Sequence, residues 1–239
     1  MARRRFFVPQ VRRGTAELTG GEAEHLVRVL RAEVGQVYEI SDNNNLYLAE
    51  VETARKSLVL FKVLEELPLP PPEAEIVLVP ALIKFDRFEW MVEKATELGV
   101  TEIRPFEAIR SERGLARAAG KRKQRWEKIA LEASQQARRV RLPAIAEAVS
   151  FSEATDLRAG VKLMLDEESD VAIWRCFPEM RATGDRIALL LGPEGGFTDE
   201  ERESANAKGW RSCSLGRTIL RAETAAAAGV SVVRAAWLA

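Results

Sequence analysis

Three stretches of the chain, at residues 76–83, 161–165 and 187–191, are almost continuously apolar. A strand that lacks alternation of apolar and polar residues is buried on both faces, as in parallel sheets covered by helices. Between and after these strands, apolar residues recur at helical spacing. We therefore predict an α/β domain with a parallel sheet. Its helices are expected at residues 88–98, 121–139, 198–209 and 222–237, with shorter strands at 100–105 and 212–215.

The first 67 residues follow a different pattern, in which short strands are separated by turn residues. The asparagines at 43–45 suit a tight reversal, because asparagine tolerates a left-handed backbone. One helix is indicated by apolar residues at helical spacing. The pattern predicts a small β-barrel with one helix. The strands are expected at residues 5–8, 37–41, 46–51 and 57–64, and the helix at 21–31.

The prolines of residues 67–73 separate the two patterns. Proline fixes φ and lacks a backbone donor, so this segment is expected to be a stiff, extended connector. The domain boundary is placed here. We expect a β-barrel domain at residues 1–69 and an α/β domain at residues 73–239.

Composition excludes several classes of function. Lys plus Arg and Asp plus Glu both number 36, so contact with a nucleic acid requires a local patch of positive charge. No apolar run has the length of a membrane span or the pattern of a signal peptide, so we expect a cytoplasmic protein without membrane contact. His25 is the sole histidine, and Cys176 and Cys213 form no CxxC pair. These counts argue against a structural zinc site and a Ser-His-Asp hydrolase, and a metal-free mechanism is expected.

The segment Leu189-Leu-Leu-Gly-Pro-Glu-Gly-Gly-Phe197 predicts a buried strand followed by a glycine-rich turn. A helix should begin directly after this turn, because Thr198 and Glu201 fit a capping box. Ligands of open α/β sheets bind beyond the carboxyl ends of strands, where glycine lets the backbone approach them. The turn matches neither GxGxxG nor GxxxxGK[ST], which excludes the dinucleotide fingerprint and the P-loop. Taken alone, it is equally compatible with an ordinary tight turn.

A second turn, Ser214-Leu-Gly-Arg-Thr-Ile-Leu-Arg-Ala-Glu-Thr-Ala225, again leads from a short strand through glycine into a helix. Arg221, Glu223 and Thr224 lie where that helix begins, and a helix start offers free N–H groups to a ligand. Two such turns after neighbouring strands would bracket one cofactor. The alternative is a helix start at which Arg221 and Glu223 are simply solvated.

Together these motifs resemble the cofactor-binding region of the SPOUT methyltransferases, and more narrowly the family that methylates N3 of a uridine in small-subunit (16S) ribosomal RNA. The resemblance covers nearly the whole chain. It is carried further by residues 25–31, 35–36, 93–100, 111–113 and 125–130, and by Gln136, Arg139 and Pro143. In one departure, Gln135 stands where the family commonly has glutamate, so this position supplies no charge or base here.

The resemblance implies a PUA-like RNA-binding β-barrel, followed by a SPOUT domain whose last segments form a trefoil knot, and a homodimer built on that knot. It also implies S-adenosylmethionine as cofactor, no metal, and 16S ribosomal RNA or the small ribosomal subunit as partner. The residues implied in cofactor binding are Leu165, Leu191, Gly192, Pro193, Glu194, Gly195, Gly196, Leu215, Gly216, Ile219, Leu220, Thr224 and Ala225.

On this assignment the sulfonium of the cofactor makes its methyl group electrophilic, so the protein must hold donor and acceptor in line. The proton on uracil N3 must also leave. We expect Arg221 to favour the anionic base electrostatically, and Glu194 or Glu223 to accept the proton directly or through water. The sequence does not choose between the two glutamates.

Basic residues cluster near the N-terminus, around residue 122 and around residue 139. Any one cluster is also compatible with a solvated face, but three in a neutral protein favour contact with RNA phosphates. Phe6, Phe7, Phe85 or Trp90 could stack on a flipped base or belong to the core. The residues expected to contact RNA are Arg3, Arg4, Arg5, Arg28, Arg31, Arg113, Lys121, Arg122, Arg138 and Arg139.

Three alternatives remain open at this point. The first is a SPOUT enzyme acting on transfer RNA or on a ribose hydroxyl. The second is a non-catalytic RNA-binding or ribosome-assembly factor, which the intact glycines of both turns disfavour. The third is a nucleotide-hydrolysing enzyme, which is disfavoured because no metal-binding acid pair accompanies a phosphate loop.

Overall fold

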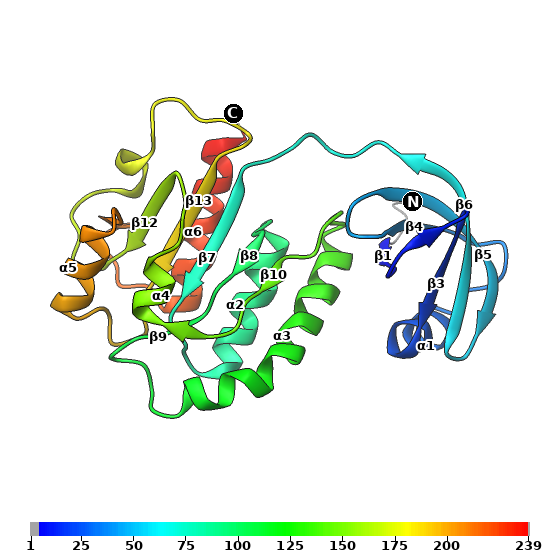
Figure 1. The fold of residues 1–239 in the computed structure, drawn as a ribbon, viewed down its shortest axis with the longest axis horizontal. Helices are drawn as coiled ribbons and strands as arrows, with labels where there is room; N and C mark the ends of the chain where they lie inside the picture. Colours follow the sequence, from blue (N-terminus) through cyan, green and yellow to red (C-terminus); the bar gives the residue numbers. More distant parts are fainter. Residues whose placement is uncertain (1–4, 239) are drawn as a thin grey trace. The chain divides into compact units, whose positions relative to one another are not determined.

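The computed structural model describes residues 5–238 and divides into two compact units (Figure 1). The first unit runs from the start of the chain to Pro71 and also contains Ser134–Leu142. The second comprises Pro72–Ala133 and the chain from Pro143 onward. The inclusion of Ser134–Leu142 in the first unit was not predicted, because these residues lie far along the chain from the β-rich segment.

The first unit is a six-stranded sheet in the order β1-β4-β5-β6-β3-β2, with β1 parallel to β4 and the other pairs antiparallel. Helix α1 (Gly20–Arg28) packs its buried Ala23 and Leu26 into the same core as Phe61. The predicted β-rich domain with one helix is confirmed. Its strands are β1 (Arg5–Phe7), β2 (Val11–Arg12), β3 (Thr15–Thr19), β4 (Val37–Ser41), β5 (Leu46–Arg55) and β6 (Leu58–Leu67).

Strands β2 and β3 were not predicted. Strand β3 has the pattern expected of a half-buried strand, with Ala16 and Leu18 buried between exposed polar residues. Two apolar residues, one of them alanine, are too weak a signal to predict a strand from the sequence.

Polar contacts, several of them partly buried, join the segment Ser134–Leu142 to the rest of the first unit. Arg5, only 8% exposed at its side chain, pairs with Glu39 at 2.8 Å between Nη2 and Oε2, and it also donates to the backbone carbonyl of Arg138. The Arg138 guanidinium donates to the other oxygen of Glu39 at 2.6 Å. Glu39 therefore lies between two arginines, one from each part of this unit.

Backbone groups of the same segment are satisfied by side chains of the sheet. The Ser41 hydroxyl donates to the carbonyl of Val140 at 2.6 Å, and the backbone N–H of Leu142 donates to Asn43 Oδ1 at 2.7 Å. In addition, the amide of Gln135 donates to Glu22 at 2.7 Å. Since an unsatisfied polar group is costly once it is removed from water, the two partly buried bonds, of Val140 and Gln135, help to fix the segment within the first unit.

The Glu39 cluster makes the stability of this unit dependent on pH. Burial alone would raise the pKa of Glu39, but hydrogen bonds and charges from Arg138 and Arg5 outweigh it and hold the pKa below its usual 4.5. A carboxyl whose pKa is depressed in the folded state stabilises the fold above its unfolded pKa, and that contribution is lost as pH falls through the folded pKa. Glu39 should therefore stabilise the protein at neutral pH and progressively less below pH 4.5.

We expect Glu39→Gln to lower the free energy of unfolding by about 2 kcal/mol at neutral pH, somewhat less than the value for a fully buried pair. The difference between variant and wild type should shrink on acidification to about pH 3.5. Urea unfolding of both proteins across this range measures it. A difference independent of pH would show that the Glu39 charge does not contribute.

The second unit is built on a six-stranded parallel sheet in the order β10-β8-β7-β13-β12-β14, as the continuous apolar stretches predicted. A small parallel pair, β9 (Phe106–Glu107) and β11 (Val149–Ser150), lies outside it. The strands of the main sheet are β7 (Glu75–Pro80), β8 (Glu102–Ile103), β10 (Ala144–Ile145), β12 (Val161–Leu165), β13 (Arg186–Leu191) and β14 (Arg211–Cys213).

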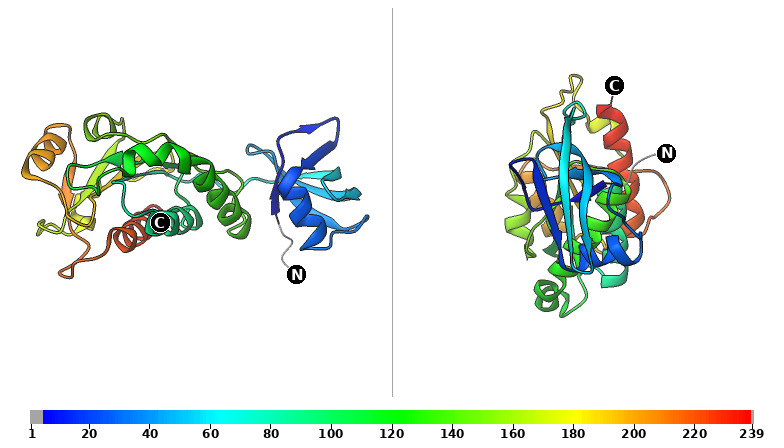
Figure 2. Two further views of the ribbon diagram at one scale, coloured as in Figure 1. Left: turned by 90° about the horizontal axis from the view of Figure 1, so that it is seen from below. Right: turned by 90° about the vertical axis from the view of Figure 1, so that its right-hand side faces the viewer.

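Helices cover both faces of this sheet (Figures 1 and 2). Along each central strand alternate residues point to opposite cores: Leu163 and Leu165 pack with α2, α3 and α6, whereas Met164 packs with α4 and α5. A strand buried on both faces needs apolar residues at every position, which explains the absence of alternation. The helices are α2 (Phe85–Glu97), α3 (Leu115–Gln136), α4 (Phe151–Thr155), α5 (Asp199–Ala207) and α6 (Ala222–Trp237), with the 3₁₀ turn η1 (Ile173–Cys176).

Several expected boundaries differ from the structure by a few residues, and two elements of the second unit illustrate the difference. Helix α3 begins after Gly114, at φ +90°, and the backbone of Arg138, at φ +55°, lies beyond its end, so the helix is shifted from the expected residues 121–139. The strand expected at 100–105 is reduced to β8. Between residues 5 and 238, no helix combines the length and apolar character needed to cross a membrane.

Helices α2 and α6 lie side by side (Figure 2) and are joined at their carboxyl ends. The Arg234 guanidinium donates to the carbonyl of Gly99 at 2.5 Å and to that of Leu98 at 3.3 Å. Gly99 has φ +91°, and a side chain there would collide with Arg234. A cation at the last carbonyls of a helix is favourable, so Arg234 fixes this end of the helix pair.

Candidate functional site

The carboxyl ends of three strands meet at one edge of the parallel sheet. Leu165, at the end of β12, pairs with Leu191 of β13 on one side and with Cys213 of β14 on the other. The two glycine-containing turns therefore leave the sheet on either side of β12. This is the position at which open α/β sheets bind ligands.

The first turn, at residues 192–196, has little room for side chains. A Cβ at Gly192 would lie 3.2 Å from the Phe197 ring, and Gly196 has φ +68° with its N–H donating to the Pro193 carbonyl at 2.9 Å. A side chain at Gly196 would also collide with the Glu167 carboxylate. Backbone conformation thus favours glycine at position 196, and the close approach of the Phe197 ring favours it at position 192.

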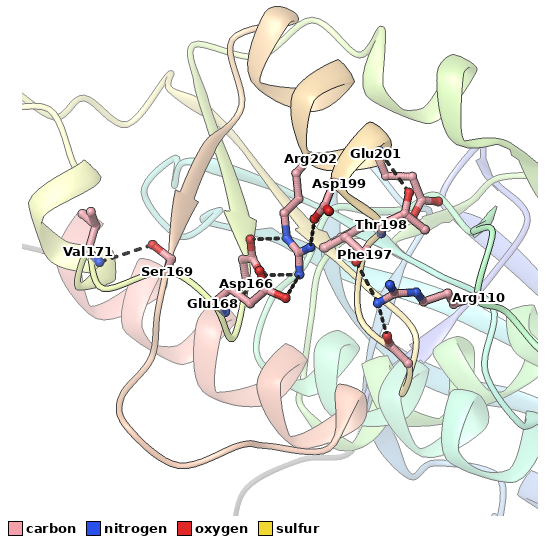
Figure 3. Close-up of polar contacts among 11 residues, drawn as sticks. Arg110, Asp166, Glu168, Ser169, Val171, Phe197, Thr198, Asp199, Glu201 and Arg202 are labelled. Atoms are coloured by element: carbon pink, nitrogen blue, oxygen red, sulfur yellow. Dashed lines mark hydrogen bonds and ion pairs between the residues drawn. The ribbon is translucent and has the colours of Figure 1, made fainter.

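Arg110 holds this turn from outside. Its Nη1 donates to the carbonyls of Gly195 at 2.9 Å and Phe197 at 3.0 Å (Figure 3). Beyond the turn, Thr198 and Glu201 form the predicted capping box, which is confirmed. The buried Glu201 also accepts from the backbone N–H of Ile109 at 2.9 Å, so the segment carrying Arg110 is attached to the start of α5.

The loop after β12 is held by a buried ion pair (Figure 3). Asp166, with its side chain 3% exposed, accepts from Arg202 of α5 at 3.0 and 3.3 Å. Arg202 also pairs with Glu168 at 2.9 Å and Asp199 at 3.1 Å. Through these contacts the Arg202 side chain connects the carboxyl end of β12 to the start of α5.

The second turn begins with Ser214, whose backbone N–H donates to Val171 at 2.7 Å and whose carbonyl accepts from Ile173 at 3.0 Å. Gly216 follows with φ +150°. Ile219 is 85% exposed, and Arg221, also exposed, is the N-cap residue of α6. Residues 216–219 of this turn are therefore exposed and do not pack in the core.

Arg87, in the first turn of α2, connects the two turns. Its Nη1 lies 3.0 Å from Oε1 of Glu194 in the first turn, and its Nε lies 4.0 Å from Oε1 of Glu223 after the second. Arg87 was not predicted from the sequence. Its position offers one signal. A cation in the first turn of a helix interacts unfavourably with the helix dipole, so its presence there indicates a partner elsewhere in the fold.

The two glutamates differ in environment. The side chain of Glu194 is 41% exposed, whereas that of Glu223 is 12% exposed. Oε2 of Glu223 is buried and has no hydrogen-bond partner within the described residues. A buried carboxylate oxygen without a donor is costly, so Glu223 is suited to accept a hydrogen bond from a ligand.

The other residues implied in cofactor binding lie at the strand ends, in the two turns and at the start of α6. Leu165 and Leu191 are buried at the strand ends, and Leu215, Leu220 and Ala225 are half-buried. Thr224 is exposed in the first turn of α6. Below them, Gly229 of α6 allows close packing, since a Cβ there would lie 2.8 Å from Leu165 Cδ1.

The residues expected to contact RNA fall into three groups. Arg3 and Arg4 lie outside the described residues. Arg28, Arg31, Arg113 and Lys121 are exposed. The others have protein partners: Arg5 and Arg138 pair with Glu39, Arg139 donates to the Arg141 carbonyl at 3.1 Å, and Arg122 lies 3.6 Å from Glu89 and over the Phe85 ring.

The aromatic candidates for base stacking also differ in their exposure to solvent. Phe6 and Phe7 are only 2% and 8% exposed. Of the two roles considered for them, base stacking and core packing, the structure supports core packing. Phe85 packs against Trp126, whereas Trp90 is 43% exposed. Within residues 5–238, no group of three or more His, Cys, Asp or Glu side chains is placed to hold a metal ion.

The second unit is thus an α/β domain with two glycine-containing turns at the carboxyl ends of its parallel strands, where open α/β sheets bind ligands, and the first is a small β-rich domain. Residues 70–234 match the model of the RNA methyltransferase domain, and residues 18–64 match that of the RNA methyltransferase PUA domain. The chain therefore belongs to the RNA methyltransferase family that these domains define. The PUA-like character expected of the first domain is confirmed.

Two curated relatives carry the name ribosomal RNA small subunit methyltransferase E. The protein from Synechocystis sp. is 31% identical over 95% of this chain and 75% of its own length. The protein from Bacillus subtilis is 30% identical over 92% of this chain and 89% of its own length. The similarity therefore includes both units.

Two solved structures are similar over almost the whole chain. Ribosomal RNA small subunit methyltransferase E from Neisseria gonorrhoeae, bound to S-adenosylmethionine, is 26% identical with a TM-score of 0.88, over 99% of this chain and 98% of that one. A putative methyltransferase from Legionella pneumophila, also in complex with that cofactor, is 28% identical with a TM-score of 0.89 at the same coverage.

Proposed function

We propose that this protein transfers the methyl group of S-adenosylmethionine to N3 of a uridine in 16S ribosomal RNA. The observation that carries the proposal is the site at the sheet edge, where Arg87 joins the two turns and a buried oxygen of Glu223 has no donor among residues 5–238. The names of the relatives support ribosomal RNA as substrate, and two similar structures contain the cofactor. The position on uracil rests on the family resemblance.

The residues at this edge fit the proposed cofactor. Glycines at 192, 195 and 196 keep side chains off the first turn, and the N-terminus of α6 presents backbone N–H groups. When bound, S-adenosylmethionine supplies an electrophilic methyl group on its sulfonium. The turns at residues 192–196 and 215–220, with the buried ends of β12 and β13, would position it.

Glu223 is the better candidate for the proton acceptor. Its Oε2 has no donor among the described residues, whereas the carboxylate of Glu194 is more exposed and lies 3.0 Å from Arg87. We propose that Glu223 accepts the N3 proton and that Arg221 stabilises the negative charge on the base. Glu194 would instead help to shape the first turn.

The RNA contact set is proposed from the exposed cations Arg28, Arg31, Arg113 and Lys121, with Arg122 added because its partner Glu89 lies as far as 3.6 Å away. Arg5 and Arg138 are left out because Glu39 occupies their guanidinium groups. The trefoil knot, the homodimer and the cytoplasmic location implied by the resemblance stay predictions.

Incubation of the protein with labelled cofactor and small ribosomal subunits, followed by nucleoside analysis, tests the function. We expect label in 3-methyluridine. Label in a 2′-O-methylated nucleoside, or in transfer RNA alone, would favour another reaction of the same class. Cofactor binding without transfer to any RNA, or no binding at all, would contradict the proposal and favour a non-catalytic RNA-binding factor.

A further inference from the structure

Arg87 is placed between two carboxylates that come from different segments. Glu194 follows β13 and Glu223 begins α6, and their contacts with Arg87 are 3.0 and 4.0 Å. The strands that lead to these segments, β13 and β14, are not neighbours, because β12 lies between them. A side chain from a third segment thus connects the two sides of the site.

Without this cation the two glutamates would repel each other across the site. The side chain of Arg87 is 32% exposed and that of Glu223 only 12%, so solvent screens their interaction incompletely. A guanidinium is planar and carries several donors, and it can therefore face two carboxylates at once. Lysine would retain the charge but not this geometry.

The packing of α2 does not depend on Arg87. Phe88, Met91 and Val92 of this helix are buried in the core, and its carboxyl end is fixed by Arg234 through Leu98 and Gly99. A cation in the first turn of a helix is also unfavourable for the helix itself. The position of Arg87 is therefore explained by the site rather than by the stability of α2.

We propose that Arg87 is a positioning residue that holds Glu194 and Glu223, and with them the two turns, in the arrangement required for methyl transfer. The inference rests on the proposed function and extends it to a residue that contacts neither reacting group. Its role is to set the place of the proton acceptor and the closure of the turns around the methyl donor.

Arg87→Ala should reduce kcat for methyl transfer roughly 10- to 100-fold, because displacement of reacting groups by about 1 Å has costs of this size. The KM for the cofactor should rise as well, since the first turn loses its link to α6. Arg87→Lys should restore part of kcat. Steady-state kinetics with small ribosomal subunits, together with calorimetry of cofactor binding, measures these effects.

Lys94→Ala is a matched control on the same helix. Lys94 is also 32% exposed and pairs with two glutamates, Glu93 at 2.7 Å and Glu97 at 3.0 Å, away from the site. It should leave kcat and KM unchanged. Lys94→Ala should shift the thermal midpoint only slightly, as loss of an exposed ion pair does, and Arg87→Ala somewhat more, because Glu223 is only 12% exposed.

A double variant separates positioning from a general structural effect. If Arg87 acts through Glu194, then Arg87→Ala combined with Glu194→Gln should cost less than the sum of the two, because neutral Gln removes the repulsion. Additive losses, or an Arg87→Ala enzyme with wild-type kcat and KM, would overturn the inference while leaving the proposed function intact. A wild-type protein that neither binds the cofactor nor transfers methyl groups would defeat both.

Discussion

Glu223→Gln is expected to lower the rate of methyl transfer roughly 100- to 10,000-fold, the range associated with loss of a general base. Glutamine has nearly the same shape but cannot accept a proton at neutral pH. Since Oε2 of Glu223 has no protein donor within residues 5–238, no internal hydrogen bond from that atom is lost. Because the amide oxygen of glutamine can still face Arg87, cofactor affinity and the thermal midpoint should change much less than the rate. Single-turnover transfer to small ribosomal subunits, with calorimetry of cofactor binding, measures both.

The matched control is Glu194→Gln, in the first turn. Because its carboxylate is 41% exposed and lies against Arg87, we expect a smaller loss than for Glu223. Arg221→Ala should slow transfer while cofactor binding is retained. If Glu194→Gln were the more damaging change, the assignment of the proton acceptor would have to be exchanged, and full transfer by Arg221→Ala would remove Arg221 from the mechanism.

Arg202→Ala should destabilise the protein by about 3 kcal/mol, as expected when one partner of a buried ion pair is removed. The reason is Asp166, whose side chain is 3% exposed and would be left as a buried charge without its donor. The cofactor affinity should fall too, since Asp166 follows Leu165 at the end of β12. Denaturant unfolding and calorimetry of cofactor binding provide the two measurements.

Two further variants test the cause of this effect. Asp166→Asn in the Arg202→Ala background should recover part of the lost stability, because it removes the uncompensated charge. Arg104→Ala, which breaks a 2.7 Å pair with Glu102 at a side chain 32% exposed, should cost less than about 1 kcal/mol. Equal losses for Arg202→Ala and Arg104→Ala would contradict the role given to burial.

The amino-acid sequence was sufficient for those features that depend on neighbours along the chain. The limits of β4, β12 and α6 agree with the predicted ones, and Thr198 with Glu201 forms the expected capping box. Apolar periodicity, turn residues and capping residues act within a few positions, so they can be recognised without knowledge of the fold. The glycines of the turn at residues 192–196 belong to the same class, because their conformation is a local property.

Contacts between distant residues were decided only by the tertiary structure. The sequence places Arg5 and Arg138 among the expected RNA contacts, whereas in the structure both pair with Glu39, which is 99 positions from Arg138. Likewise, Arg87 lies 107 positions from Glu194. That Oε2 of Glu223 has no donor within residues 5–238 depends on all the segments packed around it. A charged side chain in a sequence can face solvent, an ion-pair partner or a ligand. Which of these it does is determined by the atoms that folding brings around it, and the proposal of Glu223 rather than Glu194 as proton acceptor rests on those atoms.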